Sequence, residues 1–175
     1  MEQKGQNSIV LHLSDLHFGW TGEVASGDNR PLALTKLIQA VKKEGPEWLP
    51  NIICITGDIG WQGLKSDYSM AKKWILELLG ELGVDSNNLF LCPGNHDSYR
   101  KDANTYVRPN NGKEADRVLE LPIKGHYLQP FKSYIKFCEA LEIPEYMIGG
   151  SGSYLVGGRK CENLNIICLN SAWFS

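Results

Sequence analysis

The sequence has 175 residues, of which 42% are hydrophobic and 22% are charged, so it predicts one soluble globular domain rather than a disordered chain. The net charge of −2 argues against a protein that holds nucleic acid by bulk electrostatics, although it leaves open a nuclease that binds phosphates through metal ions. No apolar run approaches the roughly 20 residues of a membrane span, and the polar N-terminus lacks a signal-peptide pattern. We therefore expect a cytoplasmic protein with no membrane partner.

The first half of the chain alternates predicted strands and helices. Apolar runs predict strands at residues 8–14, 51–56 and 89–92, and helical spacing of apolar residues predicts helices from Pro31 and from Ser66. This β-α-β-α-β order is typical of an α/β fold with a largely parallel sheet. The first strand is expected to be central and buried on both faces, with His12 pointing into the core or a neighbouring layer.

The second half is less regular. Residues from about 99 to 126 form a polar stretch with the loop signal Pro109 to Gly112, which predicts an excursion near the site, either a lid or a partly disordered segment. A helix is expected at 130–141, followed by strands at 153–156 and 164–169. Turns are predicted at 149–152, at Gly157-Gly158 and at Glu162-Asn163. The five cysteines form no CxxC pair and are expected to be reduced thiols.

Polar side chains follow all three strands of the first half. Asp15 and His17 follow the first strand, and Asp58 follows the second in a Gly-Asp pair. The third strand leads through Pro-Gly into Asn95, His96 and Asp97. Open α/β sheets place their ligand sites at the carboxyl ends of strands, so these side chains are expected to meet.

Their chemistry suits a metal site. Asp15, His17, Asp58 and Asn95 offer oxygen ligands and one imidazole, a mixture that favours Mn, Fe or Zn. A carboxylate such as Asp58 can bridge two ions, and two ions about 3.5–4 Å apart can share a hydroxide and clamp a phosphoryl group. His96 is a candidate acid for the leaving oxygen, and Asp97 is a candidate partner that orients an imidazole.

The three motifs in this order resemble those of the calcineurin-like metallophosphoesterase family, and the run from His12 to Gly19 strengthens the resemblance. The resemblance implies a four-layer α/β/β/α sandwich with two divalent metal ions, Mn, Fe or Zn. Asp15 and His17 would bind the first metal, Asp58 would bridge, and Asn95 would bind the second. His96 would be the catalytic histidine in the hydrolysis of a phosphomonoester, phosphodiester or cyclic nucleotide through a bridging hydroxide.

The chain departs from the family's pattern in its histidines. The family completes its site with three more histidines in the C-terminal half, the last two in a Gly-His-x-His turn. This sequence has four histidines in all, and His126, the last of them, precedes the closing strands. We therefore expect residues 1–175 to be the N-terminal portion of a metallophosphoesterase domain in a longer chain, weak or inactive alone, with C-terminal strands missing.

Two other functions remain open. The same fold could serve a nuclease acting on DNA or RNA ends, which the acidic balance disfavours without excluding. It could also serve a non-catalytic scaffold, a hypothesis that rests only on the missing histidines. Trp20, Trp61 and Tyr99 flank the motifs and either line a pocket or pack in the core.

Overall fold

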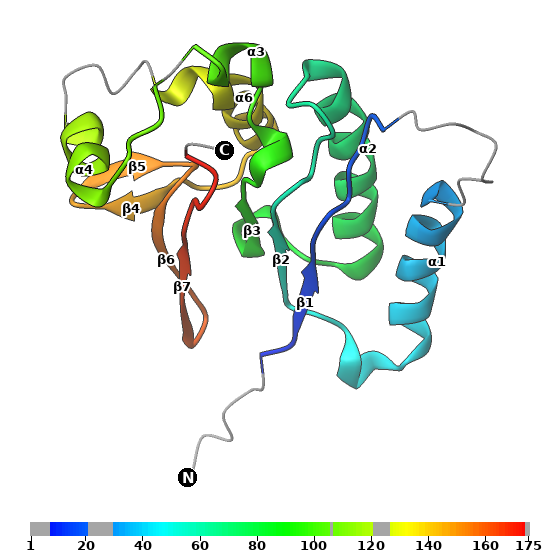
Figure 1. The fold of residues 1–175 in the computed structure, drawn as a ribbon. Coiled ribbons are helices and arrows are strands. Elements are labelled where there is room, and N and C mark those ends of the chain that lie inside the picture. The colour runs from blue at the N-terminus through cyan, green and yellow to red at the C-terminus, as the bar shows by residue number, and fades with distance from the viewer. Residues whose placement is uncertain (1–7, 21–29, 106, 121–126, 174–175) are drawn as a thin grey trace, which may run out of the picture.

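The computed structural model describes residues 8–20, 30–105, 107–120 and 127–173 (Figure 1). Its first half contains a parallel sheet in which β1 (Val10–Leu13), β2 (Ile52–Thr56) and β3 (Leu89–Cys92) lie in that order. Helices α1 (Arg30–Lys43) and α2 (Lys65–Leu82) connect the strands and lie on one side of the sheet (Figure 1). The predicted β-α-β-α-β order is confirmed.

The second half places an antiparallel sheet on the other side of the parallel one (Figure 1). Its strand order is β5-β4-β6-β7. The two sheets and the helices form a mixed α/β fold, as predicted. The remaining strands are β4 (Tyr146–Ile148), β5 (Ser151–Ser153), β6 (Gly157–Cys161) and β7 (Leu164–Cys168), the helices are α3 (Arg100–Ala103), α4 (Gly112–Glu120) and α6 (Lys132–Ala140), and the 3-10 helices are η2 (Pro46–Trp48), η3 (Ser86–Asn88), η4 (Asn95–Asp97) and η5 (Gln129–Phe131).

Two hydrophobic clusters cover the two faces of the parallel sheet. Ile53 and Ile55 of β2 pack with the helices, whereas Ile52 packs with the antiparallel sheet. The same alternation occurs in β3, where Leu91 faces the helices and Phe90 faces the other sheet. Because β2 and β3 are covered on both faces, their sequences are continuous apolar runs. All five cysteines carry free thiols, and four of them lie in or against the cluster between the sheets, namely Cys54, Cys92, Cys161 and Cys168.

The prediction that the first strand is central is wrong. β1 pairs only with β2 among the described strands, and Val10 is 44% exposed. His12, expected in the core or a neighbouring layer, is exposed, and its Nε2 lies 2.6 Å from Oγ1 of Thr56. The antiparallel sheet packs on β2 and β3, so the alternate residues of β1 have no apolar layer to face.

The predicted strand at 153–156 is also wrong. Residues 154–156 are bends, and the expected turn at Gly157-Gly158 begins β6 instead. Gly157 has a φ of 134°, and a Cβ there would lie 2.8 Å from the carbonyl oxygen of Met147. Glycine thus permits a close approach between β4 and β6, and it does not mark a turn. The predicted turn at Glu162-Asn163 does connect β6 to β7.

The polar excursion contains two helices that the sequence analysis did not predict. α4 begins where a loop was expected, because Oδ1 of Asn111 accepts a hydrogen bond from the backbone N–H of Glu114 at 3.1 Å. The Glu114 carboxylate accepts in turn from the backbone N–H of Asn110 at 2.8 Å. This reciprocal pattern is a helix N-cap, so the Asn-rich signal marked a helix start.

Helix α2 follows its prediction closely. Gly83, in the left-handed conformation, ends it with an N–H bond to the carbonyl of Leu79. Its apolar stripe is buried except for Met70, which is 47% exposed and was wrongly assigned to the core. In the parts of the chain that the structure describes, neither α2 nor any other helix is long and apolar enough to cross a membrane.

Tyr146 and Arg159 connect the two sheets. The Tyr146 hydroxyl donates to the carbonyl of Leu91 at 2.9 Å and accepts from its N–H at 2.7 Å. Arg159 donates to the carbonyl of Leu89 at 2.6 Å and lies 4.2 Å from the ring centre of Phe90. One edge of β3 pairs with no strand in the described chain. Side chains of the second sheet therefore form hydrogen bonds with the backbone groups on that edge.

We expect Tyr146→Phe to lower the free energy of unfolding by about 1–3 kcal/mol, because both buried backbone groups of Leu91 lose their partner. Urea denaturation measures the change. Tyr154→Phe is the matched control, since no hydrogen bond from the half-buried Tyr154 hydroxyl is found among the described residues. Equal effects of the two substitutions would contradict the bridging role of Tyr146.

Candidate functional site

The parallel register brings the three predicted motifs to one edge of the sheet. The backbone N–H of Asp15 donates to the carbonyl of Gly57 at 3.2 Å, and the N–H of Gly57 donates to the carbonyl of Cys92 at 2.9 Å. The ladder thus continues past the strands into the loops. A Cβ on Gly57 would lie 3.2 Å from the Cα of Gly94, so the second and third motifs approach each other closely through glycine.

Three of the predicted metal ligands adopt a left-handed backbone. The φ angles are 57° at Asp15, 47° at His17 and 52° at Asp58. Such angles cost non-glycine residues about 1–3 kcal/mol each and concentrate at functional sites. The N–H of His17 donates to the carbonyl of Asp58 at 2.8 Å, so two of the strained residues hold each other in place.

His17, Asp58 and His96 form a compact group. One ligand atom of each lies within 4.8 Å of the others, and all three side chains are half-buried. Nε2 of His17 also lies 3.8 Å from Oδ1 of Asp15, which brings a second carboxylate to the group. Two carboxylates and two imidazoles are a donor set that suits Mn, Fe or Zn.

His96 is held by contacts on several sides. Its backbone N–H donates to Oδ1 of Asp58 at 2.9 Å, and its Nδ1 lies 2.8 Å from the carbonyl oxygen of Trp61. The indole of Trp61 stacks on the imidazole at 4.5 Å between ring centres. A carbonyl oxygen only accepts hydrogen bonds, so this contact places the hydrogen on Nδ1 and leaves Nε2 for chemistry.

Asp97 acts on the backbone, whereas the sequence analysis expected it to orient an imidazole. Its buried carboxylate accepts from the N–H groups of Ile59, Gly60 and Gly94 at 3.1, 2.8 and 2.9 Å. The Tyr68 hydroxyl donates to Oδ1 at 3.0 Å. Burial raises the pKa of Asp97 to about 6, and the hydrogen bonds oppose that rise. With these donors in place, Asp97 connects the Gly-Asp loop to the Gly-Asn-His-Asp turn.

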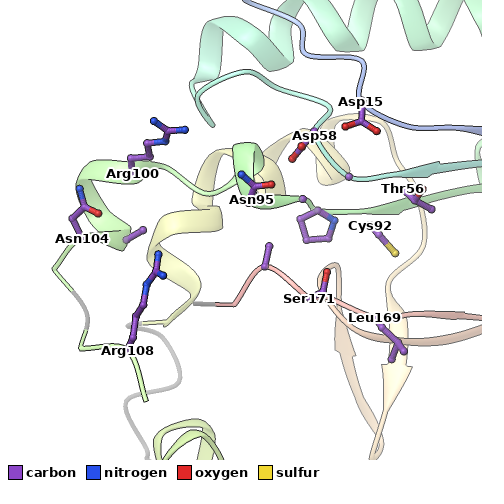
Figure 2. Close-up of a pocket in the computed structure, with 15 residues that line it drawn as sticks. Asp15, Thr56, Asp58, Cys92, Asn95, Arg100, Asn104, Arg108, Leu169 and Ser171 are labelled. Atoms are coloured by element: carbon purple, nitrogen blue, oxygen red, sulfur yellow. The ribbon is translucent and has the colours of Figure 1, made fainter. Parts of the chain in front are cut away.

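A pocket of about 770 Å³ opens beside this group (Figure 2). Asp15, Asp58 and Asn95 line it, and the Asp15 side chain is 67% exposed. His17 and His96 are not among the lining residues, so Asp58 is the residue common to the pocket and to the compact group. The other lining residues are Thr56, Gly57, Cys92, Pro93, Gly94, Arg100, Ala103, Asn104, Arg108, Leu169, Ser171 and Ala172.

The pocket contains residues that the sequence analysis missed. Arg100, Asn104 and Arg108 come from the polar excursion, whose sequence gives no sign of where it lies. Ser171 had a usable signal, since it follows strand β7 as the other polar groups follow their strands.

The three flanking aromatic residues, Trp20, Trp61 and Tyr99, do not line this pocket. Trp61 contacts His96, Trp20 lies edge-on to Trp61 at 6.4 Å, and Tyr99 is also absent from the lining. His126, at the end of the predicted polar excursion, lies outside the described residues.

We expect Asp97→Asn to lower the free energy of unfolding by about 1.5–3 kcal/mol, because the amide presents an N–H group to backbone N–H donors. The measurement is denaturation at pH 7.5, above the pKa of about 6, where Asp97 is ionised. Asp116→Asn on the exposed face of α4 is the control and should change little. If Asp97→Asn lowered the free energy of unfolding no more than Asp116→Asn, Asp97 would not be the residue that holds the two loops together.

Comparison with known proteins agrees with this geometry. The family model described as calcineurin-like phosphoesterase matches residues 9–171, which include every motif described above. No curated protein matches the chain. The matched range covers nearly the whole sequence, and it includes the three parallel strands whose ends carry the motifs. The chain therefore belongs to the calcineurin-like phosphoesterase family.

Proposed function

We propose that this chain forms the metal-binding half of a phosphoesterase that hydrolyses a phosphomonoester, phosphodiester or cyclic nucleotide. The observation that carries the proposal is the convergence of His17, Asp58 and His96 within 4.8 Å beside a pocket of about 770 Å³. The family supports metal-dependent hydrolysis of a phosphate ester. The substrate and the number of metals are part of the proposal.

The residues divide between two metal positions. Asp15 and His17 would hold one divalent ion, Asn95 would hold a second, and Asp58, which belongs to both the pocket and the compact group, would contact both. When bound, such ions polarise the phosphoryl group and supply an activated water at neutral pH. The neutral amide of Asn95 ligates without adding negative charge where a phosphate must enter.

His96 would act as a general acid that donates a proton to the leaving oxygen. The Trp61 carbonyl keeps Nδ1 protonated, and the stacked indole fixes the plane of the ring. The proton that the leaving group needs can then be delivered only from Nε2. The structure also brings His96 near enough to Asp58 and His17 to be a metal ligand, and the experiments below separate the two roles.

Further ligands are expected from outside this chain. Its histidines are His12, His17, His96 and His126, and none occupies the place of the family's C-terminal histidines. We therefore propose that sequence beyond residue 175 supplies them, and that the isolated chain hydrolyses esters slowly. The intact motif residues support an enzyme over a non-catalytic scaffold. A nucleic acid end remains a second candidate substrate, because it is also a phosphodiester.

We expect Asp58→Ala in the full-length protein to remove most of the bound Mn, Fe or Zn, because a bridging carboxylate serves both positions. Elemental analysis of the purified protein measures the metal content. Asp116→Ala is the control, since Asp116 is exposed on α4 and outside the pocket. Unchanged metal stoichiometry in Asp58→Ala would refute the bridging role.

We expect His96→Ala to retain the metals and to lower kcat by roughly 10²–10⁴-fold on esters with poor leaving groups. The loss should shrink for bis-p-nitrophenyl phosphate, whose leaving group needs little protonation. His12→Ala is the matched control, because His12 lies in β1 of the same sheet, is exposed, and belongs neither to the pocket lining nor to the compact group. Loss of metal in His96→Ala would assign His96 as a ligand, and normal turnover with a poor leaving group would refute the acid role.

A further inference from the structure

One side of the pocket is basic. Arg100, Asn104 and Arg108, named here the arginine wall, line it together with Asp15 and Asp58. Figure 2 shows the wall on one side of the pocket, the two aspartates on the other, and Asn95 between them. The wall comes from α3 and the segment that follows it, so it does not belong to the strand-end motifs.

Among the described residues, no carboxylate forms an ion pair with the wall arginines. Within the described ranges the ion pairs are His17–Asp15 and Lys42–Glu81, and neither includes a wall arginine. The carboxylates that line the pocket are Asp15 and Asp58, which the proposed metals would occupy. Two guanidinium groups that line a pocket and form no ion pair with a described residue attract an anion. Each can donate two parallel hydrogen bonds to phosphate oxygens.

The wall is anchored to the site. The backbone N–H of Tyr99 donates to the carbonyl of Pro130 at 2.8 Å, and Nε2 of Gln129 donates to Oδ2 of Asp102 at 3.4 Å. These two bonds attach α3, and the residue that precedes it, to η5. Only two residues separate Asp97, which holds the turn of His96, from Arg100. The position of Arg100 is therefore tied to the position of the candidate metal ligands.

We infer that the arginine wall binds a second phosphate of the substrate, so that the preferred substrate is an organic bisphosphate rather than a simple ester. A pocket of about 770 Å³ is in the range that holds a nucleotide-sized ligand, far more than one phosphate needs. The reacting phosphate lies at Asp15, Asp58 and Asn95, and the second lies at Arg100 and Arg108. This inference rests on the proposed function only for the position of the reacting phosphate. The position of the second phosphate does not depend on it.

Binding tests the inference without turnover. Calorimetry compares thymidine 3′,5′-bisphosphate with thymidine 5′-monophosphate, with Mn²⁺ and with EDTA. We expect the bisphosphate to bind at least about tenfold more tightly, and Arg100→Gln and Arg108→Gln each to remove most of that preference. Arg117→Gln, at an exposed arginine of α4 outside the pocket, should preserve it. Equal binding of the two nucleotides, or a preference that survives in both variants, would overturn the inference.

Turnover separates this inference from the proposed function. Thymidine 5′-(p-nitrophenyl phosphate) and its 3′-phosphorylated form release the same p-nitrophenol, and they differ only in the second phosphate. For the full-length enzyme with Mn²⁺, we expect a lower KM for the phosphorylated ester and a KM ratio near one in the wall variants. If neither these diesters nor the monoester p-nitrophenyl phosphate is hydrolysed while the variants still lose the binding preference, the proposed function fails and the second phosphate site stands.

Discussion

The site depends on one buried carboxylate, Asp97, that does not itself line the pocket. Asp97 accepts hydrogen bonds from the loop after β2 through Ile59 and Gly60, and from its own turn through Gly94. Parallel strands are connected only through long crossovers, so their end loops have no covalent reason to stay together. A single acceptor shared by two loops supplies that constraint. Burying the Asp97 carboxylate costs desolvation free energy, and this cost is the reason that the pKa of Asp97 is raised. The hydrogen bonds from its four donors offset part of the cost.

The constraint explains how strained backbone persists in the ligand residues. Asp15, His17 and Asp58 have positive φ angles, and each would relax if its loop were free. The N–H of His17 is bonded to the carbonyl of Asp58, and the loop after Asp58 is bonded to Asp97, so the strain is shared by a closed network. Side chains that would extend along a relaxed strand are turned toward one another instead. Rigid support of this kind is what a metal site needs before any ion arrives.

The sequence was sufficient for the features that repeat a simple pattern. Continuous apolar runs predicted β2 and β3, because two layers cover these strands. The polar groups at the strand ends predicted that Asp58 and Asn95 would lie at one edge of the sheet, and both line the pocket there. The sequence was not sufficient for features that depend on contacts between distant parts of the chain. The burial of β1 depends on where the second sheet stops, and Gly157 is a close-approach residue only once Met147 lies beside it. The contact of Trp61 with His96 likewise depends on a loop path that no local pattern specifies.

The two phosphate positions proposed above would attract phosphate for different reasons. Asp15 and Asp58 carry negative charge, so that end repels an anion until metal ions reverse its sign. The arginines on the opposite side carry positive charge whether or not metal is bound. Phosphate affinity at the arginine end should therefore be independent of metal, whereas affinity at the aspartate end follows metal loading. An acidic protein can in this way hold a polyanion without a broad basic surface, since the positive charge is confined to one wall of the cavity.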